Sequence, residues 1–140
     1  MKGIKEFIKE LNITTPAENE FLELSKKYPI ISELSDYENT INYERGILLY
    51  SLVAKYKFKN ILEIGTAGGY SAMCMAKALH DNNIDGKIYT IDRIGNDEKT
   101  YRLYQLPNSD KPSKRKVSNK ENWESTVSSN IIEKIIPIKG

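Results

Sequence analysis

Cysteine, histidine and tryptophan each occur once in this 140-residue chain, as Cys74, His80 and Trp123. A single cysteine excludes an internal disulfide and fits a reducing compartment. No apolar run approaches the ~20 residues of a membrane-spanning helix, and the mixed N-terminus is unlike a secretory signal. The net charge of +2 is too small to indicate binding to nucleic acid or to a membrane. We therefore expect a cytoplasmic protein without either partner.

The composition is otherwise that of a globular domain. Apolar residues make up 39% of the chain and charged residues 29%, and a chain of this length buries roughly 68–70% of its unfolded surface. Apolar residues at helical spacing predict helices at residues 2–12, after Thr15-Pro16, and over Tyr43–Tyr56. The length allows one domain at most.

A strand, a glycine turn and a helix follow one another between residues 60 and 80. Asn60–Ile64 places branched apolar residues around one carboxylate, which predicts a short buried strand. Three glycines within five residues come next, and an apolar helix is predicted over residues 70–80. This order is typical of the first half of a nucleotide-binding βαβ unit, whose helix N-terminus points N–H groups at an anionic part of the ligand.

The glycine spacing does not fit a dinucleotide. The pattern Gly-x-Gly-x-x-Gly, counted from Gly65, needs glycine where this chain has Ala67 and Tyr70. Glu63 comes two residues before the first glycine, and its carboxylate would repel a phosphate. It suits a ligand with an ammonium group and sugar hydroxyls, such as S-adenosylmethionine, which also carries a sulfonium and a carboxylate.

The stretch Leu62-Glu63-Ile64-Gly65-Thr66-Ala67-Gly68-Gly69-Tyr70-Ser71-Ala72 resembles motif I of class I S-adenosylmethionine-dependent methyltransferases. Its Gly69-Tyr70-Ser71 ending is most similar to the small-molecule O-methyltransferases of the catechol and caffeoyl-CoA type. The resemblance runs from about Ile41 to Asp92 and returns weakly at residues 134–140. It implies an α/β, Rossmann-like methyltransferase fold, S-adenosyl-L-methionine as the donor, and O-methyl transfer to a small molecule. Residues 1–58 would form a helical lid and residues 59–140 the cofactor-binding half.

The resemblance also implies roles for single residues. Glu63 and Gly65 would hold the methionine end of the cofactor, Gly69 would permit a close approach to the backbone, and Ser71 would offer its hydroxyl and N–H to the carboxylate. The loop before the third helix would lie across the cofactor. The cofactor-binding residues expected in this way are Ile41, Asn42, Glu63, Gly65, Thr66, Gly69, Tyr70, Ser71 and Asp92.

A second strand is predicted over Lys87–Asp92, and it ends in an acidic residue. A carboxylate at this place accepts hydrogen bonds from both ribose hydroxyls. The distance in sequence from Gly65 is a little longer than the ~20 residues of the dinucleotide rule. By the resemblance Asp92 holds the ribose, and the alternative is a residue that merely ends a strand in a turn.

Residues 93–119 depart from the family, in which a simple helix joins the second and third strands. We expect a mobile insertion here, with a short helix at residues 97–106 that contains Tyr101 and Tyr104. Its basic, proline-bearing part, residues 107–117, is either a solvated loop or a contact for an acidic substrate or phosphate.

The remaining residues predict a helix and a strand. Ser118-Asn119-Lys120-Glu121 is a capping box, and Trp123, Val127 and Ile131 are expected to pack from one face of the helix that follows. Residues 135–140 predict the third strand, where Pro137 suits an edge. The expected strand order is 3-2-1, which leaves the first strand as an exposed apolar edge.

Class I methyltransferases continue through a fourth strand and beyond, and in the catechol-like branch the metal ligands and the general base lie there. No residue of this chain matches them, so we nominate no catalytic residue and no metal ligand, although a longer protein could hold a divalent metal. We expect a truncated cofactor-binding part that is inactive alone. A homodimer partner or the missing C-terminal half would cover the exposed edge.

Two other functions stay open. One is an NAD-dependent Rossmann oxidoreductase, against which the glycine spacing argues. The other is a catalytically inactive fragment that binds cofactor weakly or serves as an interaction module. Titration with both ligands separates the first from a methyltransferase, and a methyl-transfer assay separates the second.

Overall fold

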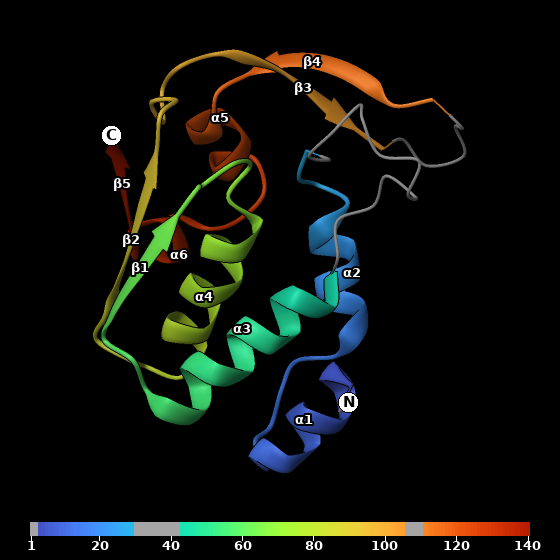
Figure 1. The fold of residues 1–140 in the computed structure, drawn as a ribbon, viewed down its shortest axis with the longest axis vertical. Helices are drawn as coiled ribbons and strands as arrows, with labels where there is room; N and C mark the ends of the chain where they lie inside the picture. The colour runs from blue at the N-terminus through green and yellow to red at the C-terminus, as the bar shows by residue number, and fades with distance from the viewer. Residues whose placement is uncertain (1–2, 30–42, 106–110) are drawn as a thin grey trace.

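The computed structural model describes residues 3–29, 43–105 and 111–140 (Figure 1). The helices are α1 (Ile4–Leu11), α2 (Glu18–Ser25), α3 (Tyr43–Tyr56), α4 (Tyr70–Asp81), α5 (Asn119–Glu124) and α6 (Ser129–Ile132). The strands are β1 (Asn60–Ile64), β2 (Lys87–Asp92), β3 (Thr100–Tyr104), β4 (Ser113–Val117) and β5 (Ile135–Lys139). No helix among these residues is long and apolar enough to cross a bilayer.

A parallel sheet in the order β1-β2-β5 forms one side of the fold, at the left of Figure 1. Ile61, Ile88 and Ile135 lie side by side in its register, one from each strand. The α/β, Rossmann-like fold and the strand order 3-2-1 are therefore confirmed, with β1 at an edge of the sheet as the structure describes it.

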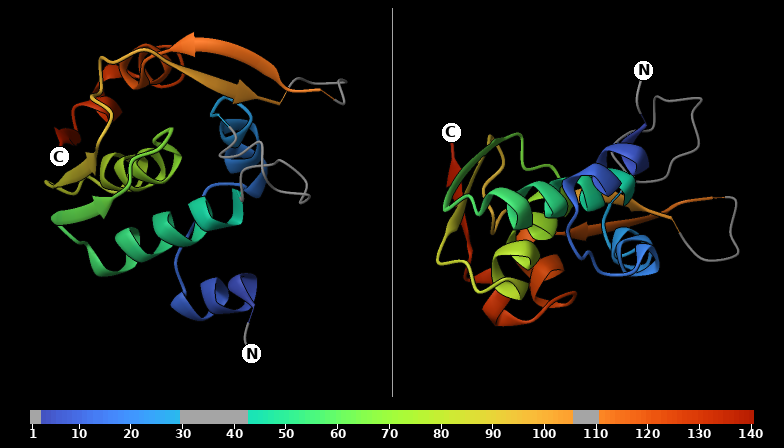
Figure 2. Two further views of the ribbon diagram at one scale, coloured as in Figure 1. Left: turned by 45° about the horizontal axis from the view of Figure 1, so that its top comes forward. Right: turned by 90° about the horizontal axis from the view of Figure 1, so that it is seen from below.

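Helices cover one face of this sheet. α4 packs on β2 and β5 and also contacts α3 and α6, while α1 and α2 pack on α3 (Figure 2). The covered side chains include Ile88 and Thr90, which are fully buried. A strand alternates its side chains between two faces, so every second residue of β2 points into this layer.

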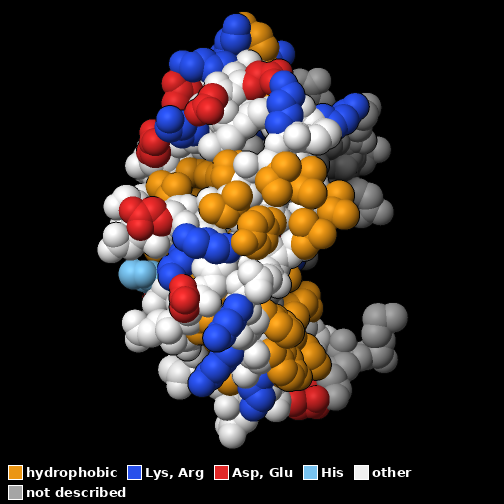
Figure 3. Space-filling view, turned by 90° about the vertical axis from the view of Figure 1, so that its left-hand side faces the viewer, with side chains coloured by type: hydrophobic (Ala, Val, Ile, Leu, Met, Phe, Trp, Pro, Cys, Tyr) orange, Lys and Arg blue, Asp and Glu red, His pale blue; other side chains and the backbone are white. Residues whose placement is uncertain are grey.

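The opposite face of the sheet is apolar and open in the described parts of the chain. Leu62 is 63% exposed and Ile64 is 82% exposed, and Ile136 and Ile138 lie on the same face (Figure 3). The expectation of a buried first strand was therefore wrong, because the residues of β1 alternate between exposed and half-buried. The reason is that helices cover only one of the two faces toward which β1 points its side chains.

The N-terminal helices follow the predicted pattern. α1 places Ile4, Phe7, Ile8 and Leu11 at helical spacing and ends at Asn12, which has a left-handed backbone with φ 49°. α3 has the predicted bounds, and its buried residues include Ile47, Tyr50 and Val53. α2 begins at Glu18, after Ala17, and ends at Ser25.

The insertion forms an antiparallel hairpin, β3–β4, that crosses above α5 and extends toward α2 (Figures 1 and 2). The predicted helix at residues 97–106 was wrong. Thr100–Tyr104 alternates in the period of a strand, with Tyr101 exposed and Tyr104 buried. The basic stretch 107–117 contains β4, while residues 106–110 lie outside the described part of the chain.

The chain returns to the sheet through two short helices. The capping box of α5 is confirmed, because the Ser118 hydroxyl accepts from the N–H of Glu121 and the Glu121 carboxylate accepts from the N–H of Ser118. Trp123 is 1% exposed, which confirms its role in packing. The single helix face was wrong, because α5 ends at Glu124 and Ile131 belongs to α6.

Candidate cofactor site

The turn between β1 and α4 depends on two glycines with left-handed backbones. Gly65 has φ 88° and Gly69 has φ 89°, a region that disfavours any residue with a Cβ atom. A Cβ atom on Gly65 would meet no atom within 4 Å, so this position borders open space. A Cβ atom on Gly69 would overlap the indole of Trp123. The first glycine therefore keeps a site open, and the second makes room for a neighbour.

Side chains from other elements fix the turn at consecutive residues. The amide of Asn119 donates to the Ala67 carbonyl at 3.0 Å, and the indole N–H of Trp123 donates to the Gly68 carbonyl at 3.0 Å. The N–H of Ala67 donates to Asp92 Oδ2 at 2.9 Å. Ala67 itself has a left-handed backbone with φ 47°, and this bond helps to hold it there. The short helix α5 is thus part of the support of the turn.

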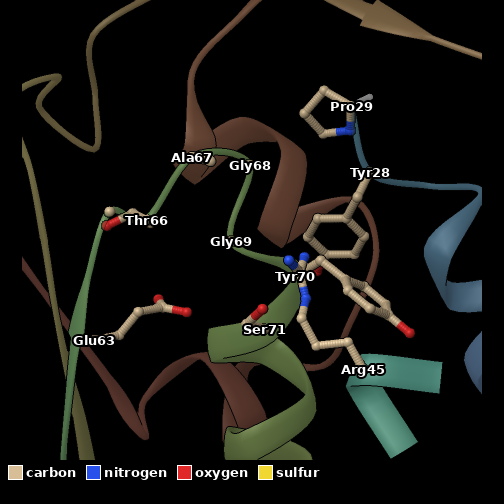
Figure 4. A pocket seen from close by; sticks show the side chains of 11 residues that line it. Tyr28, Pro29, Arg45, Glu63, Thr66, Ala67, Gly68, Gly69, Tyr70 and Ser71 are labelled. Atoms are coloured by element: carbon tan, nitrogen blue, oxygen red, sulfur yellow. The ribbon is translucent and has the colours of Figure 1, made fainter. Parts of the chain in front are cut away.

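A pocket lies under this turn (Figure 4). β1, α3, α4 and the segment after α2 all contribute to its lining, which consists of Tyr28, Pro29, Arg45, Glu63, Gly65, Thr66, Ala67, Gly68, Gly69, Tyr70 and Ser71. It sits at the carboxyl end of β1, which is the edge where ligands bind in open α/β sheets. The position is thus the one expected for a cofactor.

Glu63 supplies the negative charge of the pocket. Its carboxylate points into the pocket (Figure 4), and its Oε2 accepts from the Thr90 hydroxyl at 2.6 Å. Thr90 in turn lies 2.6 Å from the hydroxyl of Thr66. Burial raises the pKa of Glu63, while the Thr90 bond and the charge of Arg45 act in the opposite direction. A cationic group of a ligand would offset the energetic cost of burying the Glu63 carboxylate.

The positive charge comes from Arg45 and from the start of α4. The Arg45 side chain extends from α3 into the pocket toward Tyr70 and Ser71 (Figure 4). α4 has Gly69 as its N-cap and no side chain that caps it, so the partial positive charge of the helix end faces the same space. The pocket thus offers a carboxylate on one side and a cation on the other. This arrangement fits the amino and carboxylate groups of an amino acid.

Tyr70 lines the pocket and also joins α4 to the N-terminal helices. Its hydroxyl donates to the Tyr43 carbonyl at 3.1 Å, with the Phe21 carbonyl at 3.3 Å, so it ties α4 to the N-terminal helices. Burial raises the pKa of Tyr70 far above its usual range. The phenol therefore stays protonated and serves as a structural donor.

Asp92 does not line this pocket. Its carboxylate accepts from the N–H of Ala67 and, at 3.1 Å, from that of Ile94. Partial burial acts to raise the pKa of Asp92, but these backbone donors and the charge of Arg102 together lower it. The carboxylate is thus ionised at neutral pH, at the carboxyl end of β2 and next to the glycine turn.

The structure brings most of the predicted site residues together. Glu63, Gly65, Thr66, Gly69, Tyr70 and Ser71 line one pocket, Asp92 lies beside it, and Ile41 and Asn42 lie outside the described residues. Sequence reasoning missed Arg45 and Thr90. Thr90 was recognisable as the inward residue of β2 paired with Glu63 in the parallel register. Arg45 belongs to no motif of its own, and it reaches the pocket because α3 packs against α4.

No group of three or more metal-ligating side chains occurs in residues 3–29, 43–105 and 111–140. Cys74 is buried in α4, and burial raises its pKa to about 12. The thiol is therefore neutral and serves in packing. The chemistry of the described site thus comes from Glu63, Arg45, the glycine turn and Asp92.

Comparison with known proteins agrees with this geometry. A sequence search among curated proteins found no match to the chain. A family model described as O-methyltransferase matches residues 14–133, which include the glycine turn, all of β2 and α5. The chain therefore belongs to this O-methyltransferase family, whose members are class I S-adenosylmethionine-dependent methyltransferases.

Proposed function

We propose that the pocket binds the methionine end of S-adenosylmethionine and that the enzyme transfers its methyl group to an oxygen atom of a small molecule. The observation that carries this proposal is the pairing of Glu63 with Arg45 and the N-terminus of α4 across one pocket. An α-amino acid bears an ammonium and a carboxylate on the same carbon atom, and few other metabolite groups need both partners. A diphosphate would meet the Glu63 carboxylate and be repelled.

Each residue has a separate role in this arrangement. Glu63, held by Thr90, accepts from the ammonium group and stabilises the nearby sulfonium charge. Arg45 and the N–H of Ser71 bind the carboxylate, because the start of α4 has no capping side chain to compete. When bound, S-adenosylmethionine supplies an electrophilic methyl group. The residues act by fixing its position and orientation.

Asp92 is proposed to hold the ribose. Its ionised carboxylate stands at the carboxyl end of β2, beside the turn whose Ala67 N–H it binds. Each carboxylate oxygen has a second lone pair, so both can also accept from ribose hydroxyls. The cofactor would then extend from the pocket across the glycine turn. The lack of a Cβ atom at Gly65 leaves that path open.

Calorimetric titration of the protein with S-adenosylmethionine tests the proposal, with S-adenosylhomocysteine and NAD⁺ as comparison ligands. We expect saturable binding of the first two and much weaker binding of NAD⁺. Asp92→Ala and Arg45→Gln should each weaken binding by about 1.5–3 kcal/mol, the usual contribution of hydrogen bonds to charged groups. Lys55→Gln is the matched control, since Lys55 is an exposed cation on the same helix as Arg45. Tighter binding of NAD⁺ would overturn the proposal, and unchanged affinity in Asp92→Ala would remove Asp92 from the site.

A further inference from the structure

The β3–β4 hairpin places two arginines directly opposite each other. Arg102 of β3 pairs with Arg115 of β4 in the antiparallel register. Like charges at directly opposed positions destabilise a sheet. The register therefore places two arginine side chains on the same face of the hairpin, at directly opposed positions.

Both arginines lie around one buried tyrosine. Tyr104 is on the same face of the hairpin, and the guanidinium carbon of Arg115 is 5.0 Å from its ring centroid. Burial raises the pKa of Tyr104, and the charges of Arg102 and Arg115 both counteract that rise. The Tyr104 hydroxyl donates to Asn122 Oδ1 at 3.0 Å, which joins the hairpin to α5. We call Arg102, Arg115, Tyr104 and Asn122 the hairpin cluster.

Two donors of the hairpin cluster have no acceptor among the described residues. Arg102 Nε and Asn122 Nδ2 are buried and, within the described residues, make no hydrogen bond. Asn122 is only 8% exposed. A buried donor without a partner costs about 1–3 kcal/mol. Because both orphaned atoms are donors and the cluster also carries two positive charges, the group that would satisfy them is an anionic acceptor.

Acidic residues near the base of the hairpin do not fill this role. Glu121 pairs with Lys99 at 2.5 Å. Lys120 engages Asp97 and Lys139 engages Glu98. These contacts leave Glu121, Asp97 and Glu98 bound to lysines, while the two arginines act on the Tyr104 ring. Burial lowers the pKa of Arg102, and the negative charge of Asp92 acts to raise it.

We propose that the hairpin cluster binds an oxyanion, a phosphate or a carboxylate, of the methyl acceptor. Guanidinium groups bind such oxyanions with two parallel hydrogen bonds, which suits a pair of arginines supported by an amide N–H. Asp92 lies within electrostatic reach of Arg102, so the cluster borders the part of the site assigned to the ribose. The assignment to the acceptor rests on the proposed methyltransferase function. The enzyme would thus select anionic acceptors.

Titrations of the full chain with inorganic phosphate, phenyl phosphate and benzoate test the cluster, at constant ionic strength with chloride as the blank. We expect saturable binding of a phosphate or of benzoate, and the tighter one identifies the oxyanion. Arg102→Gln and Arg115→Gln should each weaken that binding at least tenfold. Lys116→Gln is the matched control, because Lys116 is next to Arg115 but lies on the opposite face of the hairpin, near Tyr101. Its effect should stay below about twofold, because Lys116 lies outside the hairpin cluster.

Two further measurements keep the outcome clear. Thermal unfolding should show that Arg115→Gln is no less stable than the wild type, because the opposed charge is gone, so a loss of binding is not a loss of fold. S-adenosylmethionine titration of Arg115→Gln should be unchanged, because Arg115 lies away from the cofactor residues. Absence of saturable binding by every oxyanion, or equal losses in Lys116→Gln and Arg115→Gln, would overturn the cluster as a site. If the chain bound an oxyanion but did not bind S-adenosylmethionine, the proposed function would be overturned. The assignment of the cluster to a methyl acceptor would then fail as well.

Discussion

The two faces of the β1-β2-β5 sheet are both largely apolar, yet they differ in how far helices bury them. On the covered face, Ile88 and Thr90 are fully buried under α4 and its neighbours. On the open face, the rows Leu62-Tyr89-Ile136 and Ile64-Ile91-Ile138 run across all three strands (Figure 3). The covered face also carries Glu63, the one carboxylate among the described residues that line the pocket.

This contrast teaches that burial and side-chain chemistry are separate properties of a strand. Parallel strands in α/β proteins are usually apolar on both faces, because helices pack on each. Here the residue types fit that pattern, but in the described residues the helices occupy one face. The covered face bears the fold's stability and holds Glu63, while the open face contributes little packing. Each prediction below tests that division.

The largest difference in stability is expected between two Ile→Ala variants, one on each face of the sheet. Ile88→Ala, on the covered face, should lower the free energy of unfolding by about 2–5 kcal/mol, because it leaves a cavity under α4. Ile64→Ala, on the open face, should change it by less than about 0.5 kcal/mol, since Ile64 is 82% exposed. Urea unfolding followed by circular dichroism measures both. Similar losses from the two variants would show that the open face is packed in solution.

The next effect concerns the turn that leaves the covered face. Gly69→Ala should destabilise by about 1–2 kcal/mol for the left-handed backbone and by about 1–3 kcal/mol for the overlap with Trp123. Gly65→Ala has the backbone strain without the overlap, so its loss should be the smaller of the two. Gly3→Ala is the control, with neither a positive φ nor a neighbour within 4 Å. If Gly65→Ala and Gly69→Ala lost equal stability, the contact between Gly69 and the Trp123 indole would not contribute to it.

The sequence predicted β1, β2 and the glycine turn correctly in position for a physical reason. Asn60–Ile64, the three glycines and Lys87–Asp92 are local patterns, and each fixes its own strand or turn. The hairpin was missed because the Tyr and Arg residues of 97–106 fit a short helix as readily as a strand, and pairing with β4 decides between them. Arg45 and Asn119 reach the site only through packing of distant segments, which no local pattern records.

Glu63 provides a test in which affinity and stability should move in opposite directions. Burial raises the pKa of Glu63, so the folded state favours the protonated form. The stability from this group is therefore present below its unfolded pKa and is lost as the pH rises through its folded pKa. Glu63→Gln should leave stability at pH 7 unchanged or higher, and weaken S-adenosylmethionine binding about 10- to 150-fold.

The pH dependence of binding separates charge from shape at the same residue. In the wild type, affinity should fall as the pH drops through the raised pKa of Glu63, because the neutral acid no longer attracts a cation. Glu63→Gln should bind weakly at every pH, without that transition. Glu6→Gln, on the exposed side of α1, should keep the wild-type profile. A pH-independent wild type would exclude Glu63 as the partner of the cation.

The smallest effect is expected where α5 supports the turn from outside the sheet. Trp123→Phe keeps an aromatic ring but loses the N–H that donates to the Gly68 carbonyl, so it should destabilise by about 0.5–1.5 kcal/mol. Circular dichroism must follow the unfolding, because Trp123 is the only tryptophan. In the wild type the same indole reports ligand binding: filling the pocket shifts the turn that it touches and should change its fluorescence. Tyr56→Phe, at an exposed ring, should leave stability within about 0.5 kcal/mol. Two results would contradict this: Trp123→Phe as stable as Tyr56→Phe, and a wild-type fluorescence that does not change with S-adenosylmethionine. The turn would then keep its shape without support from α5.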